Sequence, residues 1–242
     1  MRLLRFLAAQ AAPMPAARIA ASLGLPRSSV YHLLAVLRRE GFVTHFREER
    51  RYGLGLASFE LGSAYSRQAP LQRLARPVVA RLVDTVGHNG HLGVLHGNEV
   101  LYLIEERAAG RPALVTEVGV RLPASLTASG LAMLSALPAA QVRALYPARA
   151  AFVRRHGAGP TSLAELRRLL VDVRRDGFAR EDGQVTVGFA SVAAPVRDHW
   201  GHPLAAVALT YASADVPPAE RDRLAAAVLR SADDLSRRVL GG

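Results

Sequence analysis

Residues 17–34 read ARIAASLGLPRSSVYHLL, and this stretch decides the fold of the first part of the chain. Ile19 and Leu23 are four positions apart, which predicts one apolar face on a short helix. Gly24 then predicts a turn, and Pro26 suits the first position of a second helix. That helix continues to Glu40 and is ended by a glycine. Helix, glycine turn and helix together predict a helix-turn-helix unit.

The second helix of this unit divides into two kinds of face. Its apolar face is made by Val30, Leu33, Leu34 and Leu37. Near its start it offers side chains that can contact bases or phosphates, namely Arg27, Ser28, Ser29, Tyr31 and His32. A helix that enters the major groove by its first turn needs this division, and its free N–H groups favour phosphate. We therefore expect this helix to read DNA.

Two short strand-like runs follow, over 42–46 and 51–54, with a polar hairpin tip between them. They predict a wing beside the helix-turn-helix. The basic side chains placed for phosphate or minor-groove contact are Arg18, Arg38, Arg47, Arg50 and Arg51. A helical hairpin inside an ordinary bundle is the alternative interpretation of residues 17–34. The wing and the local charge favour DNA binding over that alternative.

Charge and composition narrow the class of protein. The net charge is +11, and residues 1–62 hold nine Arg against four acidic residues. The chain has no Lys and no Cys, which excludes Schiff-base lysines, disulfides and thiolate metal sites. No apolar run reaches transmembrane length, and the first residues do not form a convincing signal peptide. We expect a cytoplasmic protein.

The remaining sequence alternates helices and strands without a strict repeat. Strands are expected over 90–95, 99–105, 114–118, 191–197 and 204–211, and helices over 57–69, 127–136, 138–146, 162–176 and 217–240. A further helix begins between Pro70 and Pro77 and runs to about Val86. This order predicts an α+β class for the second part of the chain.

The sequence holds little that supports catalysis. His88 and His91, and likewise His199 and His202, are three apart but have no evident third metal ligand. His91 is better interpreted as a wall residue on a strand. No nucleophile, dinucleotide or phosphate-binding motif is present, so we expect no catalytic residue, no metal and no cofactor. The rival hypothesis is a small-molecule-binding enzyme whose N-terminal part is an interaction module.

The chain resembles the IclR family of bacterial transcription regulators along nearly its whole length. The matching stretches are 19–30, Tyr52-Gly53-Leu54-Gly55, 60–62, 75–78, 91–95, 119–123 and 193–196. The resemblance implies a winged helix-turn-helix domain over 1–56, a linker helix over 57–69 and a C-terminal α+β, GAF-like domain over 70–242 for effector binding and oligomerisation. It also implies a homodimer or homotetramer on a palindromic operator, with recognition helices about 34 Å apart.

The resemblance further implies an effector pocket. Its residues would be Ser125, Thr127, Ala128, Ser129, Gly130, Glu181, Asp182, Ser191, Ala208 and Thr210. Plainer interpretations stay open: Thr127 and Ser129 as helix caps, Glu181 and Asp182 as a solvated turn, and Ser191 and Thr210 as small strand residues. The family often has His at position 125 and Cys at 191, and one well-known member has a hydroxyl side chain at the position that matches Ala208. Organic acids and aromatic catabolites are the family's usual ligands, and these departures prevent a transfer of effector identity.

Overall fold

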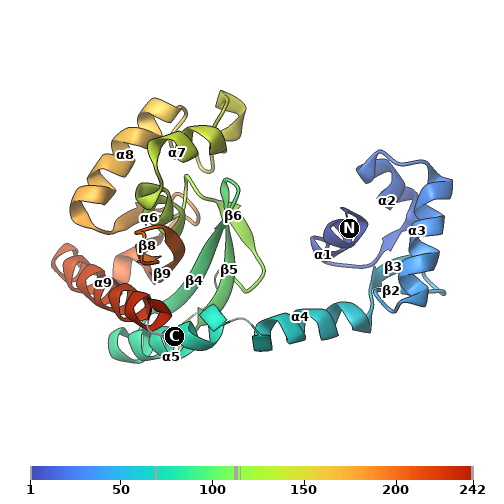
Figure 1. The fold of residues 1–242 in the computed structure, drawn as a ribbon, viewed down its shortest axis with the longest axis horizontal. Helices are drawn as coiled ribbons and strands as arrows, with labels where there is room; N and C mark the ends of the chain where they lie inside the picture. Colours follow the sequence, from blue (N-terminus) through green and yellow to red (C-terminus); the bar gives the residue numbers. More distant parts are fainter. Residues whose placement is uncertain (1, 69, 112–113, 115, 241–242) are drawn as a thin grey trace. The chain divides into compact units, whose positions relative to one another are not determined.

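The computed structural model describes residues 2–68, 70–111, 114 and 116–240. The chain divides into two compact units, Met1–Ala69 and Pro70–Gly242 (Figure 1). Each unit has its own hydrophobic core. No helix in the described ranges is both long and apolar enough to cross a membrane.

The first unit is a winged helix-turn-helix. It contains α1 (Arg2–Ala8), β1 (Met14–Pro15), α2 (Ala16–Leu23), α3 (Arg27–Arg39), β2 (Val43–Phe46), β3 (Arg51–Leu54) and α4 (Leu56–Gln68). Ile19, Val30 and Leu34 are fully or almost fully buried and hold α2 against α3. Gly24 lies in the left-handed region at φ 64°, where its N–H bonds back to α2. The turn between the two helices therefore requires glycine.

Three details of this unit differ from the sequence-based expectation. The apolar spacing of Leu3, Leu4 and Leu7 predicts a helix over 1–11, but α1 ends at Ala8, and Met14–Pro15 forms a two-residue strand that pairs with Tyr52 and Arg51. Helix α3 begins at Arg27, so Pro26 is its N-cap and not its first residue. Leu33 is 41% exposed, because the buried face of α3 follows Val30, Leu34 and the half-buried Leu37.

The second unit is built on a six-stranded sheet of order β6-β5-β4-β9-β8-β7. Its strands are β4 (Asn89–His96), β5 (Glu99–Glu106), β6 (Arg121–Pro123), β7 (Ala179–Asp182), β8 (Phe189–Arg197) and β9 (Pro203–Ala212). All neighbouring strands are antiparallel. The strands predicted over 90–95 and 99–105 are confirmed, and they form a hairpin, since β4 ends at His96, β5 begins at Glu99 and the two pair antiparallel.

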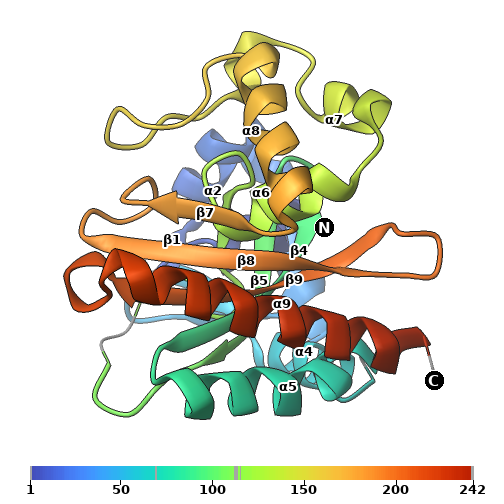
Figure 2. The ribbon, with the colours of Figure 1, turned by 90° about the vertical axis from the view of Figure 1, so that its left-hand side faces the viewer.

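Helices cover both faces of this sheet (Figure 2). On one face α5 (Pro70–Val86) and α9 (Pro218–Leu240) pack on Val192, Val207 and Leu209. On the other face α6 (Ala128–Ala136) and α8 (Leu163–Asp176) pack over Ala193, Ala206 and Ala208. Helix α7 (Ala139–Leu145) and two 3₁₀ turns, η1 (Arg149–Ala151) and η2 (Ser213–Asp215), complete the unit. The small alanines on the second face leave space for α6 to approach the sheet closely.

The strand expected over 114–118 is wrong for the residues of that range that the structure describes. Leu114, Thr116 and Glu117 lie outside regular structure, and position 115 is outside the described residues. The strand that pairs with β5 is β6, a few residues later. Strand β7 was not predicted, because its four residues show no long alternation of apolar and polar side chains.

Candidate DNA-binding surface and effector cavity

Helix α3 has one buried face and one exposed face, as a helix that enters a DNA groove requires. Val30 and Leu34 face the core, whereas the predicted reading residues are exposed, namely Arg27, Ser28, Ser29, Tyr31 and His32. Tyr31 is a large aromatic side chain with 54% of its surface exposed. The described part of the unit leaves much of this ring uncovered. A large exposed aromatic side chain suits a surface that binds a partner.

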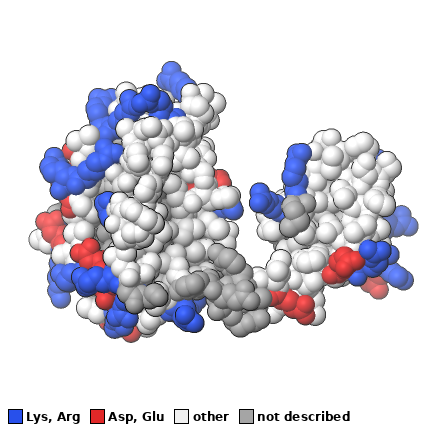
Figure 3. Space-filling model, viewed as in Figure 1, with Lys and Arg blue, Asp and Glu red and all other residues white. Residues whose placement is uncertain are grey.

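The remaining predicted DNA contacts are exposed as well, on α2, at the end of α3 and on the hairpin of β2 and β3: Arg18, Arg38, Arg47, Arg50 and Arg51. Among the described side chains of residues 2–62, ion pairs join Arg39 to Glu40 and Arg51 to Glu49. Positive and negative side chains therefore lie next to each other at the end of the unit that carries the hairpin (Figure 3). Arg50 adopts a left-handed backbone with φ 52°, as hairpin tips commonly require.

The candidate effector cavity begins as a row of residues across four strands. Glu181 on β7 pairs with Ser191 on β8, Ser191 pairs with Thr210 on β9, and Thr210 pairs with Asn89 on β4. Residues paired directly across neighbouring strands point to the same face of a sheet. Glu181, Ser191 and Thr210 therefore face α6, and Ala208 and His91 form the next row on that face.

The start of α6 closes this face. Five apolar residues line the cavity: Leu114, Ala128, Val185, Phe189 and Ala208. Six lining residues carry an aliphatic hydroxyl: Thr116, Thr127, Ser129, Thr186, Ser191 and Thr210. His91, Tyr102 and Glu181 complete the lining. The empty space is ≈420 Å³ including the open mouth, but little of it is enclosed. The enclosed part has room for about one ordered water, so a larger ligand requires the walls to move apart.

Glu181 is the acidic residue among the described residues of this lining. The Ser191 hydroxyl donates to its Oε1 at 2.7 Å, and the Gln184 N–H donates to its Oε2 at 3.1 Å. Ser191 also lies 3.0 Å from the Thr210 hydroxyl. Burial raises the pKa of Glu181, and hydrogen bonds from Ser191 and Gln184 oppose that shift. The interpretation of Glu181 as part of a solvated turn is wrong, because its residue is 5% exposed on strand β7.

Two neutral rings form the opposite wall. Burial lowers the pKa of His91 to about 3, so its imidazole is uncharged near neutral pH. Its Nδ1 is buried and has no hydrogen-bond partner among the described residues. Burial raises the pKa of Tyr102 to about 12, and hydrogen bonding to Ser129 opposes part of this shift. The rings of His91 and Tyr102 meet edge to face, with centroids 5.8 Å apart.

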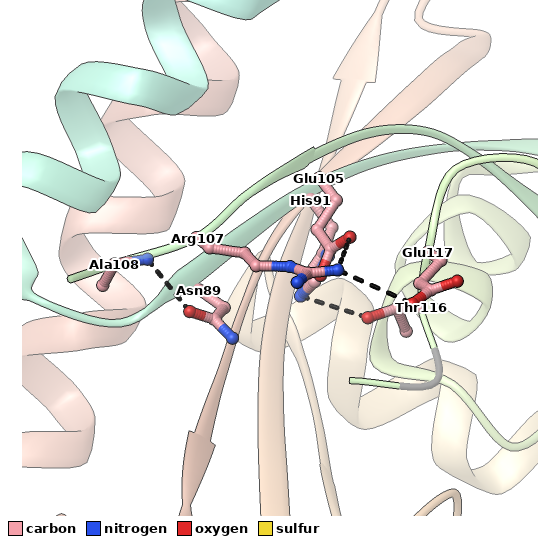
Figure 4. A network of polar contacts seen from close by, with 7 residues as sticks. All are labelled: Asn89, His91, Glu105, Arg107, Ala108, Thr116 and Glu117. Carbon is pink, nitrogen blue, oxygen red and sulfur yellow. Dashed lines mark hydrogen bonds and ion pairs between the residues drawn. The ribbon is translucent and has the colours of Figure 1, made fainter. Parts of the chain in front are cut away.

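A loop residue closes the cavity beside His91 (Figure 4). The Thr116 hydroxyl lies 3.4 Å from His91 Nε2. The next residue, Glu117, lies 3.6 Å from the Arg107 guanidinium, which donates two hydrogen bonds to Glu105. Arg107 is therefore paired with two carboxylates, and one of them belongs to the residue that follows Thr116.

The structure brings most of the predicted pocket residues together. Thr127, Ala128, Ser129, Glu181, Ser191, Ala208 and Thr210 all line one cavity. Three others do not line it. Ser125 is buried elsewhere, Gly130 packs against the backbone of Ala124, and Asp182 is exposed and bonded to Ser213 and Arg221. Adjacent strand residues point to opposite faces, which separates Asp182 from Glu181.

Sequence reasoning missed several lining residues. Tyr102 lies at an inward position of β5, between the buried Val100 and Ile104, and a buried phenol on a strand was the available signal. Thr116, Val185, Thr186 and Phe189 come from loops or a strand end, where periodicity carries no information. Within the described ranges, no group of three or more His, Cys, Asp or Glu side chains is placed to hold a metal ion.

Comparisons with known proteins agree with this architecture. Residues 1–45 match the profile of the IclR helix-turn-helix domain, and residues 63–237 match the bacterial transcriptional regulator IclR C-terminal domain. The glycerol operon regulatory protein of Streptomyces coelicolor is 32% identical over 208 residues, covering 86% of this chain and 81% of that protein.

Two solved structures share the fold. An IclR-type transcriptional regulator from Alicyclobacillus acidocaldarius has a TM-score of 0.86 at 22% identity, covering 98% of this chain and 95% of that one. An IclR homologue from Microbacterium hydrocarbonoxydans, complexed with 4-hydroxybenzoate, has a TM-score of 0.81 at 22% identity with the same coverage of both chains.

A winged helix-turn-helix joined to an α+β domain with a lined cavity defines a ligand-responsive type of DNA-binding regulator. The chain belongs to the IclR family of bacterial transcription regulators. Its second unit is the GAF-like domain of that family, and the relatives named above are regulators.

Proposed function

We propose that this protein binds a palindromic operator through α3 and the wing, and that a small molecule in the cavity changes that affinity. The observation that carries the proposal is the exposed start of α3, with Arg27, Ser28 and Ser29 free of the core. A side chain that reads bases must be held by a packed helix and left uncovered. In this proposal the protein binds DNA and a small molecule and catalyses no reaction. It does so in the cytoplasm, where bacterial operators lie.

We propose the following contacts. Arg27, Ser28, Ser29, Tyr31 and His32 read bases, while basic residues on α2, α3 and the hairpin contact phosphates, namely Arg18, Arg38, Arg47, Arg50 and Arg51. Two chains place two α3 helices about one DNA turn apart, so a dimer or a dimer of dimers is the functional assembly. The stretch 57–69 then acts as the linker between the operator-binding and effector-binding parts.

A substitution in α3 tests the DNA-binding surface. Arg27→Ala is expected to weaken operator binding strongly, because a bidentate arginine contact contributes about 1–3 kcal/mol of discrimination between bases. The measurement is fluorescence anisotropy with DNA from upstream of the gene, at several salt concentrations. Binding by the unsubstituted protein should weaken steeply with salt.

Arg143→Ala is the matched control, because Arg143 is an exposed arginine on α7 of the other unit. Circular dichroism of both variants should match the unsubstituted protein. Operator affinity of Arg27→Ala equal to that of the control would contradict the assignment of α3. Failure of the unsubstituted protein to bind any upstream DNA would contradict operator binding itself.

The effector part of the proposal is supported by the cavity and by one relative. The Microbacterium homologue is complexed with 4-hydroxybenzoate and shares the fold of this chain. The cavity here lies between α6 and the sheet, with seven of the ten residues that the family resemblance implies. Its lining differs enough from an anion site that the chemistry of its ligand needs a separate argument.

A further inference from the structure

We propose that the cavity takes an uncharged, polyhydroxylated molecule of a few carbons, such as a small polyol or sugar, and discriminates against carboxylates. This inference rests on the proposed effector function and specifies the ligand class for the same site. It is carried by the placement of Glu181 among hydroxyl side chains, with no cationic side chain among the described residues of the lining.

Glu181 presents an acceptor to the cavity. Glu181 accepts hydrogen bonds from the Ser191 hydroxyl and from the backbone N–H groups of Gln184 and Val185. A carboxylate has about four acceptor positions, so these three bonds leave capacity for about one hydrogen bond from a ligand that donates.

Nothing in the described lining offsets that negative charge. His91 is neutral near pH 7, and Arg107 behind Thr116 is occupied by Glu105 and Glu117. Burying a carboxylate ligand beside Glu181 would place two like charges at close range with little water to screen them. The cavity therefore differs in charge from a site built to bind an organic acid.

The rest of the lining fits ligand hydroxyls. Six aliphatic hydroxyls, the Tyr102 phenol and the unpartnered Nδ1 of His91 can each donate or accept, depending on rotamer or tautomer. A neutral polyol supplies both donors and acceptors on every carbon. An ammonium ligand could pair with Glu181, but it would leave most of these hydroxyls without a matching acceptor.

The experiment is a charge series on one scaffold, measured with the full-length protein by isothermal titration near neutral pH. The probes are the linear polyols from glycerol to sorbitol, each with its aldonate and its terminal amino-polyol. We expect at least one polyol to bind, and its aldonate to bind at least about tenfold more weakly. Glu181→Gln should reduce that ratio to about threefold or less, because it removes the charge and keeps the size.

Asp182→Asn is the matched control, since Asp182 is the next residue but points away from the cavity. It should leave the polyol-to-aldonate ratio unchanged. Three results would overturn the ligand class: an aldonate that binds more tightly than its polyol, an amino-polyol that binds most tightly, or no polyol that binds at millimolar concentration.

Operator anisotropy in the presence of each probe separates this inference from the proposed function. A polyol that binds without changing operator affinity contradicts effector control and leaves the ligand class intact. Release of the operator by a carboxylate such as 4-hydroxybenzoate, but by no polyol, contradicts the ligand class and leaves effector control intact.

Discussion

At residue scale, Gly130 shows how a small residue near a cavity can serve packing. A Cβ at this position would lie 2.1 Å from the carbonyl oxygen of Ala124, which is backbone and cannot move aside easily. The family resemblance placed Gly130 among the ligand contacts. In the structure, the absence of a side chain at Gly130 allows α6 to lie close to the preceding loop. A ligand role for Gly130 has no support in the geometry.

Gly130→Ala is therefore expected to destabilise the second unit by about 1–3 kcal/mol, the usual range for overpacking a buried site. Urea unfolding followed by circular dichroism measures the change. Gly62→Ala is the control, because Gly62 lies exposed in α4 with open space around it. That variant should be neutral or slightly more stable, since alanine favours helix. Equal stability of the Gly130→Ala variant and the unsubstituted protein would contradict the packing role.

His91 makes stability depend on pH. Burial lowers the pKa of this imidazole to about 3 in the folded state, while the unfolded chain titrates near 6.5. Below pH 6.5 the unfolded state therefore takes up a proton that the folded state does not, and stability falls as pH decreases toward 3. At pH 5 this costs about 2 kcal/mol relative to neutral pH.

His91→Phe should remove this part of the pH dependence between pH 7 and 5, measured by urea unfolding at each pH. Burial also lowers the pKa of His88, so the informative quantity is the difference between variant and unsubstituted protein. The exposed His199, changed to Gln, serves as control and should keep the original slope. A His91→Phe variant with an unchanged slope would show that His91 does not stay neutral.

At the scale of elements, two helix N-termini in the second unit have the same kind of cap but different surroundings. Thr127 accepts a hydrogen bond from the Gly130 N–H at 3.0 Å, and Ser162 accepts one from the Glu165 N–H at 3.2 Å. Thr127 lines the cavity and Ser162 does not. Comparing variants of Thr127 and Ser162 therefore separates the effect of helix capping from the effect of ligand contact.

Thr127→Ala and Ser162→Ala should each lower the free energy of unfolding by about 1 kcal/mol, the usual contribution of an N-cap side chain. Only Thr127→Ala should also weaken effector binding, as measured by titration with whichever probe binds the unsubstituted protein. Equal ligand affinity in both variants would leave Thr127 with a capping role alone.

Elements with long periodic patterns could be predicted from sequence, and short ones could not. The apolar positions of 162–176 and 217–240 repeat over several turns, and both helices are present. Met14–Pro15 and Ala179–Asp182 are strands because β3 and β8 pair with them, which no local pattern encodes. The expected strand at 114–118 failed for the converse reason: the described residues of that β-prone run, 114 and 116–118, pair with no strand. Glu181 was consequently misjudged as solvated, since its burial depends on β7.

At the scale of the whole molecule, coupling between cavity and operator must be reciprocal. If an effector changes operator affinity by some factor, operator DNA must change effector affinity by the same factor. We expect a factor of about 5 to 150, typical of such coupling. Titration of effector into free protein and into the protein–operator complex measures one side, and anisotropy with and without effector measures the other. Unequal factors would mean that effector and operator bind different assemblies.

The domain organisation and the class of protein could be predicted because they depend on many weak signals spread along the chain. The ligand could not, because it depends on which side chains meet across β4, β7, β8 and β9. Ser191 and Thr210 are nineteen positions apart in sequence, yet their hydroxyls lie 3.0 Å apart. Strand register and the loop at Thr116 bring these groups together, and the local periodicity of the sequence predicts neither of them.

The strand order of the second unit bears on the order in which the chain can fold during synthesis. Strand β9 comes last in sequence but lies in the middle of the sheet, where it joins 206–210 to 89–93 on β4. Until β9 has left the ribosome, the edges of β4 and β8 that it will cover remain unpaired, and unpaired edges favour aggregation. All residues of the helix-turn-helix are available long before that point. A truncated product can thus complete the helix-turn-helix unit while it lacks the sheet that forms the proposed effector cavity.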